Sequence, residues 1–173
     1  YISYGANPGP SNVPDGAVWK LDTKTGAFTD ITPMKPGADL GGGNFDRFGY
    51  SALALDRQHP GTLLTATIDR WGPGGEIFRT RDGGKHWTAL AKQATFDPGR
   101  ARWLVEKPDE KLNPVQWVGD MAIDPHNPDH AYFTTGGGVW MTKKLTAADR
   151  KEGTHWRFAN KDLEETAVLE MMS

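Results

Sequence analysis

Short apolar runs alternate with turn residues along the whole chain. Two stretches, 53–67 and 121–135, share one order: an apolar run, an aspartate, a proline-containing turn and a second apolar run. The aspartates are Asp56 and Asp124. Aspartate and proline at such offsets reverse the chain tightly, and the carboxylate can accept hydrogen bonds from N–H groups of the turn. Each stretch therefore predicts two strands joined by a tight turn.

A third strand, opened by glycine, follows each pair and also occurs near the start of the chain. Its aromatic residue is Trp19, Phe78 or Trp140, so Phe78 lies 59 residues after Trp19 and Trp140 lies 62 after Phe78. A further aromatic residue follows each third strand, at Phe28, Trp87 and Trp156. The repeating unit is therefore four short strands in about 60 residues, and such repeats indicate a β-propeller with one sheet per blade.

We therefore predict an all-β chain of about three four-stranded antiparallel blades. The expected parts are a blade remnant over about 1–33, blades over about 49–92 and 117–160, and the first strand of a next blade over about 164–173. The best candidate for a helix is a short insertion within 145–152. Because a partial ring would leave unpaired sheet edges, we expect the remaining blades to come from the same polypeptide or from other chains.

Composition agrees with many turns and narrows the classes of function. The 173 residues include 21 Gly, 12 Pro and 7 Trp, far more than a helical bundle uses. The net charge of -2 predicts no nucleic-acid partner and no anionic membrane partner. The chain has no cysteine and its five histidines show no metal spacing, so we predict neither metal nor cofactor. No segment approaches the roughly 20 apolar residues of a membrane helix.

The stretch RTRDGGKHW, residues 79–87, falls between the third and fourth strands of the second unit. Thr80, Asp82, Gly84 and Trp87 fit the Asp-box pattern Ser/Thr-x-Asp-x-Gly-x-x-Trp. The carboxylate is expected to accept backbone N–H groups of its own turn, and the glycine to adopt a positive φ. The tryptophan can bury its ring between blades. We therefore interpret these four residues as structural rather than catalytic.

An ordered set of short motifs resembles glycoside hydrolase family 74, the xyloglucanases. The motifs are YISYGANPGP at 1–10, DGAVWK at 15–20, FTDITP at 28–33, GYSALALD at 49–56, DRW at 69–71, WVGDMAIDP at 117–125 and LEETAV at 163–168. The likeness runs nearly the whole length and is weakest from about 93 to 113. No single motif is specific, whereas the ordered set is.

The resemblance implies a segment of the first of two seven-bladed propellers. Such enzymes are endo-acting and hydrolyse β-1,4-glucan backbones such as xyloglucan with inversion, which requires two carboxyl groups about 6.5–9.5 Å apart. The family carries one catalytic aspartate on each propeller, and both would lie outside this segment. We therefore predict no catalytic residue here, an inactive segment that forms a wall of the substrate cleft, and a secreted or periplasmic enzyme whose export signal lies outside this sequence.

Given that resemblance, six residues are candidate contacts with the polysaccharide. Four of them flank two innermost strands, and two lie on the loop 69–74, which is rich in glycine and proline. Sugar rings stack on aromatic faces, and their hydroxyls bind charged side chains. The alternatives are that both aromatic residues beside the innermost strands fill the core and that the loop tryptophan folds back over its blade. The six residues are Arg47, Tyr50, Trp117, Asp120, Arg70 and Trp71.

Two other functions fit an Asp-box propeller. One is a non-catalytic scaffold that binds protein partners or polysaccharide. The other is a sialidase-like enzyme, which needs arginines on inner strands to clamp a carboxylate, whereas most arginines here fall on turns or outer strands. The adjacent Glu164 and Glu165 would point to opposite faces of a strand and so do not form a simple catalytic pair.

Overall fold

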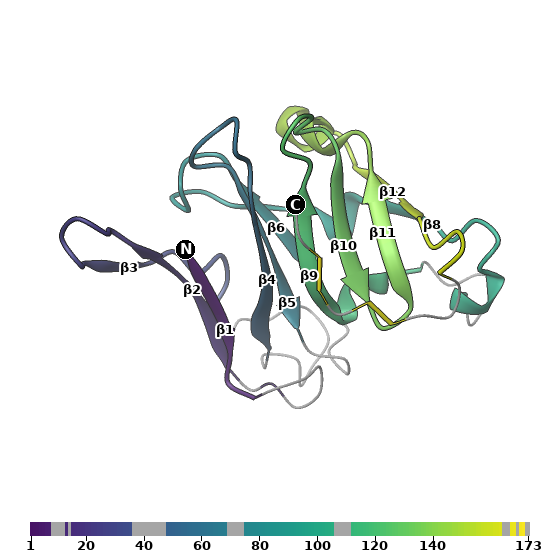
Figure 1. Ribbon diagram of the computed structural model, residues 1–173, viewed down its shortest axis with the longest axis horizontal. Coiled ribbons are helices and arrows are strands. Elements are labelled where there is room, and N and C mark those ends of the chain that lie inside the picture. The colour runs from purple at the N-terminus through teal and green to yellow at the C-terminus, as the bar shows by residue number, and fades with distance from the viewer. Residues whose placement is uncertain are drawn as a thin grey trace.

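In the described residues, three mainly antiparallel sheets follow one another along the chain and lie side by side (Figure 1). The computed structural model describes residues 1–7, 13, 15–35, 48–68, 75–105, 112–163, 167–168 and 170–171. Within those ranges the helical residues form only four short 3₁₀ helices. The prediction of an all-β chain built from successive blade-like sheets is confirmed.

Each sheet runs through its strands in chain order, with one exception. The first sheet contains β1 (Ile2–Gly5), β2 (Gly16–Leu21) and β3 (Phe28–Asp30). The second contains β4 (Gly49–Leu55), β5 (Leu63–Ile68), β6 (Ile77–Thr80) and β7 (Thr88–Ala89). The third contains β9 (Val118–Ile123), β10 (Ala131–Thr135), β11 (Gly138–Thr142), β12 (His155–Phe158) and, beside β12, β8 (Thr95–Asp97). The strand β8 pairs parallel to β12, and the sequence pattern did not predict it.

The 3₁₀ helices lie between strands. They are η1 (Ala91–Gln93), η2 (Arg102–Leu104), η3 (Pro114–Gln116) and η4 (Leu145–Arg150). The last of these is the short helix expected within 145–152. In the range 164–173, where a further strand is predicted, the described residues 167, 168, 170 and 171 belong to no strand.

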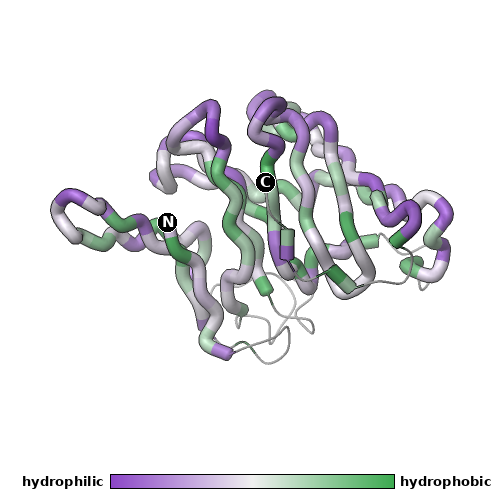
Figure 2. The backbone as a smooth tube through the Cα atoms, in the orientation of Figure 1, coloured by the Kyte–Doolittle hydropathy of each residue, from purple (hydrophilic) through white to green (hydrophobic). Residues whose placement is uncertain are grey.

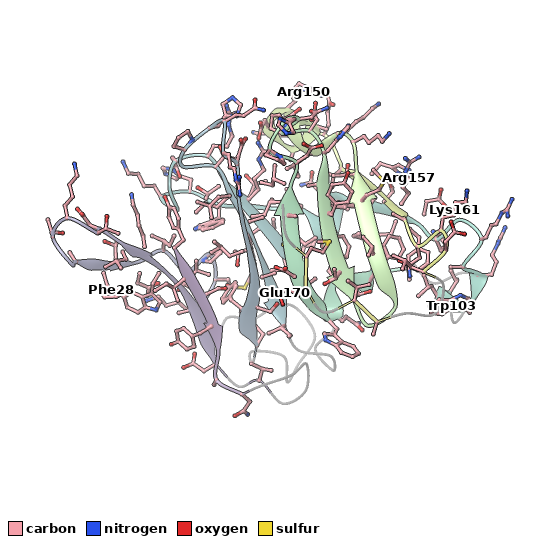
Figure 3. The ribbon with its side chains drawn as sticks, viewed as in Figure 1. Phe28, Trp103, Arg150, Arg157, Lys161 and Glu170 are labelled. Atoms are coloured by element: carbon pink, nitrogen blue, oxygen red, sulfur yellow. The ribbon has the colours of Figure 1, made fainter. Side chains whose placement is uncertain are left out.

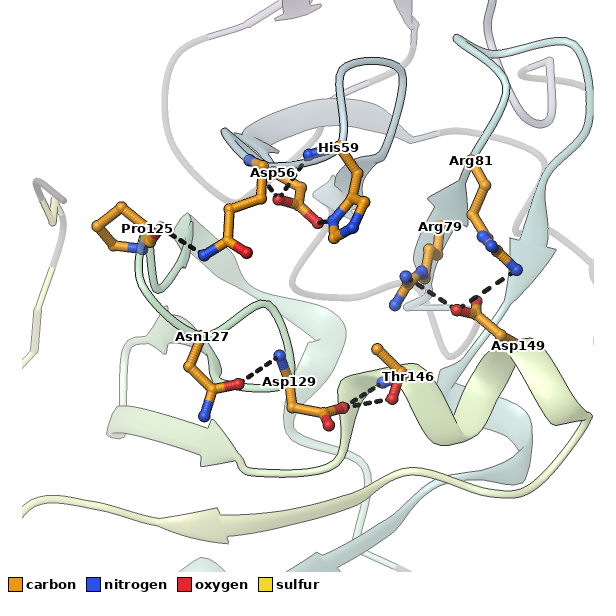
Figure 4. Close-up of polar contacts among 10 residues, drawn as sticks. Asp56, His59, Arg79, Arg81, Pro125, Asn127, Asp129, Thr146 and Asp149 are labelled. Atoms are coloured by element: carbon orange, nitrogen blue, oxygen red, sulfur yellow. Dashed lines mark hydrogen bonds and ion pairs between the residues drawn. The ribbon is translucent and has the colours of Figure 1, made fainter.

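The two predicted aspartate turns are confirmed. The Oδ1 atom of Asp56 accepts two backbone N–H groups of its turn, at 2.8 and 3.1 Å, and that of Asp124 does the same at 2.8 and 3.2 Å. The two turns also touch, because the side-chain amide of Gln58 donates to the carbonyl of Pro125 at 2.9 Å (Figure 4). These contacts fix the second and third sheets against each other at one edge.

The described residues form two apolar core clusters between neighbouring sheets. The larger spans the second and third sheets and includes the fully buried Phe133, Trp140 and Trp156. The smaller joins the first and second sheets around Val18 and Phe78. Apolar residues lie along the strands, and polar residues gather at the turns (Figure 2). The apolar residues that alternate along the sequence therefore pack between neighbouring sheets.

The turn at 80–87, interpreted above as an Asp box, joins the second sheet to the first. The hydroxyl of Thr80 donates to Oδ1 of Asp82 at 2.8 Å, and the same oxygen accepts two following backbone N–H groups, each at 3.0 Å. Gly84 has a φ of 89°, and a side chain there would collide with Ile31. The indole N–H of Trp87 donates to the carbonyl of Ile31 at 2.8 Å. We infer that these residues close the turn and tie it to the neighbouring sheet.

Substituting Asp82 with asparagine is expected to lower the melting temperature at neutral pH. The backbone N–H and imidazole of His86, then the hydroxyl of Thr80, hold the pKa of Asp82 far below its ordinary value near 3.8. Because the pKa is lowered in the folded state, the carboxylate stabilises that state fully when the pH is above the ordinary pKa. This stabilisation is lost as the pH falls toward the lowered pKa of the folded state. The gap in melting temperature between wild type and Asp82→Asn should therefore narrow below about pH 4.

Thermal unfolding of the full-length protein between about pH 3 and pH 7 measures this gap. Asp97→Asn is the control, because the exposed Asp97 carboxylate accepts a single backbone N–H from the described part of the chain, that of Gly99. Asp97→Asn should lower the melting temperature less than Asp82→Asn does. A gap for Asp82→Asn that stays constant down to the lowest pH would contradict the prediction.

Candidate functional site

The innermost strands of the second and third sheets start next to each other at one edge of the molecule. The hydroxyl of Ser51 donates to the carbonyl of Val118 at 2.5 Å, and Ile68 and Trp117 form an isolated antiparallel bridge. In Figure 1 this edge is the lower one, where β10 also ends. The start of β9 is thus held against both β4 and β5 at this edge.

Trp117 lies at this edge, directly before β9. Its ring packs against Gly136 in the turn between β10 and β11, and a side chain at position 136 would collide with the indole. The residue is half-buried, unlike the fully buried Trp140 and Trp156. Trp117 is therefore anchored on one neighbour and also keeps part of its surface open to solvent.

Asp120 lies on β9 and fixes two other segments. Its backbone N–H donates to the hydroxyl of Thr134 at 2.9 Å. Its carboxylate accepts the backbone N–H of Met121 at 2.8 Å through one oxygen and that of Met171 at 2.8 Å through the other. Asp120 therefore holds the chain near residue 171 against the innermost strand, at the same edge as Trp117.

Tyr50 lies in the smaller core cluster, with 1% of its surface exposed. Its hydroxyl donates to the carbonyl of Met34 at 2.6 Å and accepts the backbone N–H of the same residue at 3.1 Å. The rings of Phe48 and Phe78 lie 5.7 and 6.4 Å from its centroid. Burial raises the pKa of the phenol, despite the bond to Met34. Of the two interpretations offered by the sequence, this geometry favours core filling.

Three of the candidate contacts, Arg47, Arg70 and Trp71, lie outside the described residues, as do Glu164 and Glu165. Of the other three, Trp117 and Asp120 share one edge of the innermost strands, whereas Tyr50 packs between sheets.

The opposite edge holds a partly buried ion pair between the second and third sheets (Figure 4). Arg79 on β6 has a side chain only 5% exposed, and it donates to the carboxylate of Asp149 on η4 at 3.2 Å. The exposed Arg81 lies 3.6 Å from the same oxygen. Burial lowers the pKa of Arg79, and the charge of Asp149 opposes that shift. This cluster joins two sheets.

A groove that the sequence did not predict lies beside β12. It has a volume of about 600 Å³ and is lined by residues of the loop 98–103 and by residues between 158 and 161. The half-exposed Trp103 forms part of it. The sequence signal was a tryptophan set among glycine and arginine residues, in the region where the motifs are weakest.

Among the described residues, no group of three histidine, cysteine, aspartate or glutamate residues is placed to hold a metal ion. Within the same part of the chain, no helix has the length and apolar character needed to cross a membrane.

Comparisons with known proteins point to one class of enzyme, although no family model matches the chain. A xyloglucanase from a Paenibacillus species is 36% identical over 188 residues, covering 100% of this chain and 18% of the relative. Xyloglucanase Xgh74A of Acetivibrio thermocellus is 33% identical, covering 100% of this chain and 22% of the relative. The crystal structure of the GH74 xyloglucanase from Xanthomonas campestris matches with a TM-score of 0.74 and 37% identity, over 90% of this chain and 21% of that one.

The chain therefore spans about a fifth of the length of the curated relatives it matches. Both the sequence and the arrangement of the three sheets agree with those of the relatives over nearly all of the chain. The chain is thus a xyloglucanase-like segment, related along its whole length to glycoside hydrolase family 74.

Proposed function

We propose that the full-length protein hydrolyses β-1,4-glucan backbones such as xyloglucan, acting within the chain and inverting the anomeric carbon. The observation that carries this proposal is the 36% identity to a xyloglucanase across the whole segment. Inversion needs two carboxyl groups about 6.5–9.5 Å apart with water between one of them and the sugar. In this proposal both groups come from outside these 173 residues, and further blades complete the ring.

Within the proposed enzyme, this segment supplies part of the cleft wall rather than the reacting groups. Trp117 is the described residue best suited to stack on a sugar, because its indole is half-buried and held by Gly136. Asp120 acts by positioning the chain near Met171. The sequence alone supports three further proposed contacts with the polysaccharide, which are Arg47, Arg70 and Trp71. A polymeric substrate also fits a secreted or periplasmic protein.

The test is to incubate the full-length protein with xyloglucan and measure new reducing ends. We expect reducing ends to form, chain length to fall early in the reaction, and NMR of the first products to show the α-anomer, as inversion of a β-linkage requires. Unchanged xyloglucan and unchanged mixed-linkage and cellulosic glucans would overturn the proposal. Binding to xyloglucan without cleavage would instead indicate the non-catalytic scaffold.

Trp117→Ala is expected to raise KM for xyloglucan about tenfold with a smaller change in kcat, because it removes a stacking surface used in the ground state as well as the transition state. Phe28→Ala is the matched control, since Phe28 is an exposed aromatic residue on β3, at the other end of the molecule from Trp103 and Lys161 (Figure 3). It should leave both constants unchanged. If wild type and Trp117→Ala have the same kcat and KM for xyloglucan, Trp117 does not contact the substrate.

A further inference from the structure

We propose that the groove beside Trp103 binds an acidic sugar, meaning a pyranose ring that carries a carboxylate. This goes beyond the hydrolysis of a glucan backbone proposed above. The groove lies where the loop 98–103 faces the end of β12 and the residues up to Lys161. Trp103, Lys161 and Arg157 lie at the same end of the molecule (Figure 3).

The walls of the groove are fixed by hydrogen bonds. The side chain of Asn160, 2% exposed, accepts the backbone N–H of Val139 at 2.5 Å and donates to the carbonyl of Leu163 at 2.9 Å. In the facing loop, the backbone N–H of Ala101 donates to the carbonyl of Pro98 at 2.9 Å. A ligand would therefore enter a largely preformed groove, which lowers the ordering cost of binding.

Trp103 supplies a flat apolar platform in this groove. Phe158 packs edge to face against it, with the ring centroids 6.2 Å apart and the planes at 87°. This contact orients the indole but leaves 52% of the residue exposed. An oriented and exposed aromatic ring suits the apolar face of a pyranose.

The charges in the groove distinguish an acidic sugar from a neutral one. Among the described residues, those that line it include two cations, Arg100 and Lys161, and no carboxylate. Across the described ranges, neither cation forms an ion pair with an acidic residue. The exposed Asp97 and Asp162 adjoin lining residues in the chain but are not among those that line the groove, so the positive charge is confined to the groove itself. Guanidinium and ammonium groups beside an aromatic platform match a carboxylate on a stacked ring.

Isothermal titration of the full-length protein with tetragalacturonate and with its fully methyl-esterified, uncharged form tests the proposal. We expect the acidic oligosaccharide to bind about tenfold more tightly at low salt, and its affinity to fall as the salt concentration rises. The charge variant Arg100→Gln/Lys161→Gln should bind tetragalacturonate about tenfold more weakly, and Trp103→Ala should lose a similar factor. Lys24→Gln/Lys85→Gln changes the net charge equally at exposed positions elsewhere and should bind as wild type does.

Equal affinity for the two oligosaccharides, or unchanged tetragalacturonate binding in Arg100→Gln/Lys161→Gln, would overturn the proposal. Xyloglucan hydrolysis measured on the same samples keeps the two proposals apart. Hydrolysis without tetragalacturonate binding would remove only the acidic-sugar site. Binding that depends on Trp103 and both cations, without hydrolysis, would remove only the proposed enzymatic function.

Discussion

Replacing Trp156 with alanine is expected to destabilise the native state by about 3–5 kcal/mol. The indole is fully buried in the larger core cluster, and the ring of Phe133 lies 4.9 Å from it at 64°. Its N–H donates to the hydroxyl of Thr154 at 3.0 Å. The substitution removes apolar contacts, leaves a cavity beside β10 and β11, and deprives the threonine of a partner.

Phe28→Ala is the control for Trp156→Ala, because the two residues hold equivalent positions in their repeating units. Phe28 and Trp156 are the aromatic residues that follow the third strands of their units, but Phe28 is 58% exposed. Its removal should change the free energy of unfolding by about 0.5 kcal/mol or less. Denaturant unfolding, together with hydrogen exchange of the β10–β12 amides, measures both effects in the full-length protein. A cost below about 1 kcal/mol for Trp156→Ala would show that the third sheet does not depend on this cluster.

The blade pattern could be predicted because its signals are local in sequence. Asp56 and Asp124 accept bonds from N–H groups only two and three residues away, so each turn is encoded where it occurs. Alternating apolar residues then determine which face of each strand packs on the next sheet. These are short-range effects, and they repeat with the unit.

Features that depend on distant segments were not predicted. β8 pairs with β12, which begins 60 residues later, as the register of Thr95 with His155 shows. Glu76 would be expected on the surface, yet it is 2% exposed and its carboxylate accepts the backbone N–H groups of Ile77 and Ala91. Burial raises the pKa of that carboxyl, which those bonds only partly oppose. Neither arrangement leaves a signal in the neighbouring residues.

In the candidate site, too, the local sequence predicts where a residue lies on its strand but not what packs against it. Tyr50 and Trp117 occupy similar places at the start of innermost strands, so sequence alone could not separate a core residue from an exposed one. The difference comes from segments that pack against them. The backbone of Met34 bonds to the Tyr50 hydroxyl inside the core, whereas the indole of Trp117 lies against the backbone of Gly136 and the residue stays half-buried.

The ion pair at the opposite edge gives an expected asymmetry between its two partners. Asp149→Ala should cost about 2–3 kcal/mol, because it leaves the guanidinium of Arg79 buried without a counter-ion. The Nε and Nη1 atoms of Arg79 already lack a partner among the described residues, so the remaining charge would be poorly satisfied. Arg81 would then add repulsion, since it shares the same carboxylate.

Arg79→Met should cost less than Asp149→Ala, because the apolar side chain fills similar space without a buried charge, and Asp149 can still pair with Arg81. The double variant Arg79→Met/Asp149→Ala should therefore be more stable than Asp149→Ala alone. Glu152→Ala, which breaks the exposed pair with Arg150, is the control and should leave unfolding unchanged. If Asp149→Ala and the double variant unfold at the same denaturant concentration, the penalty does not arise from the unpaired guanidinium, and the contact would join the two sheets through packing alone.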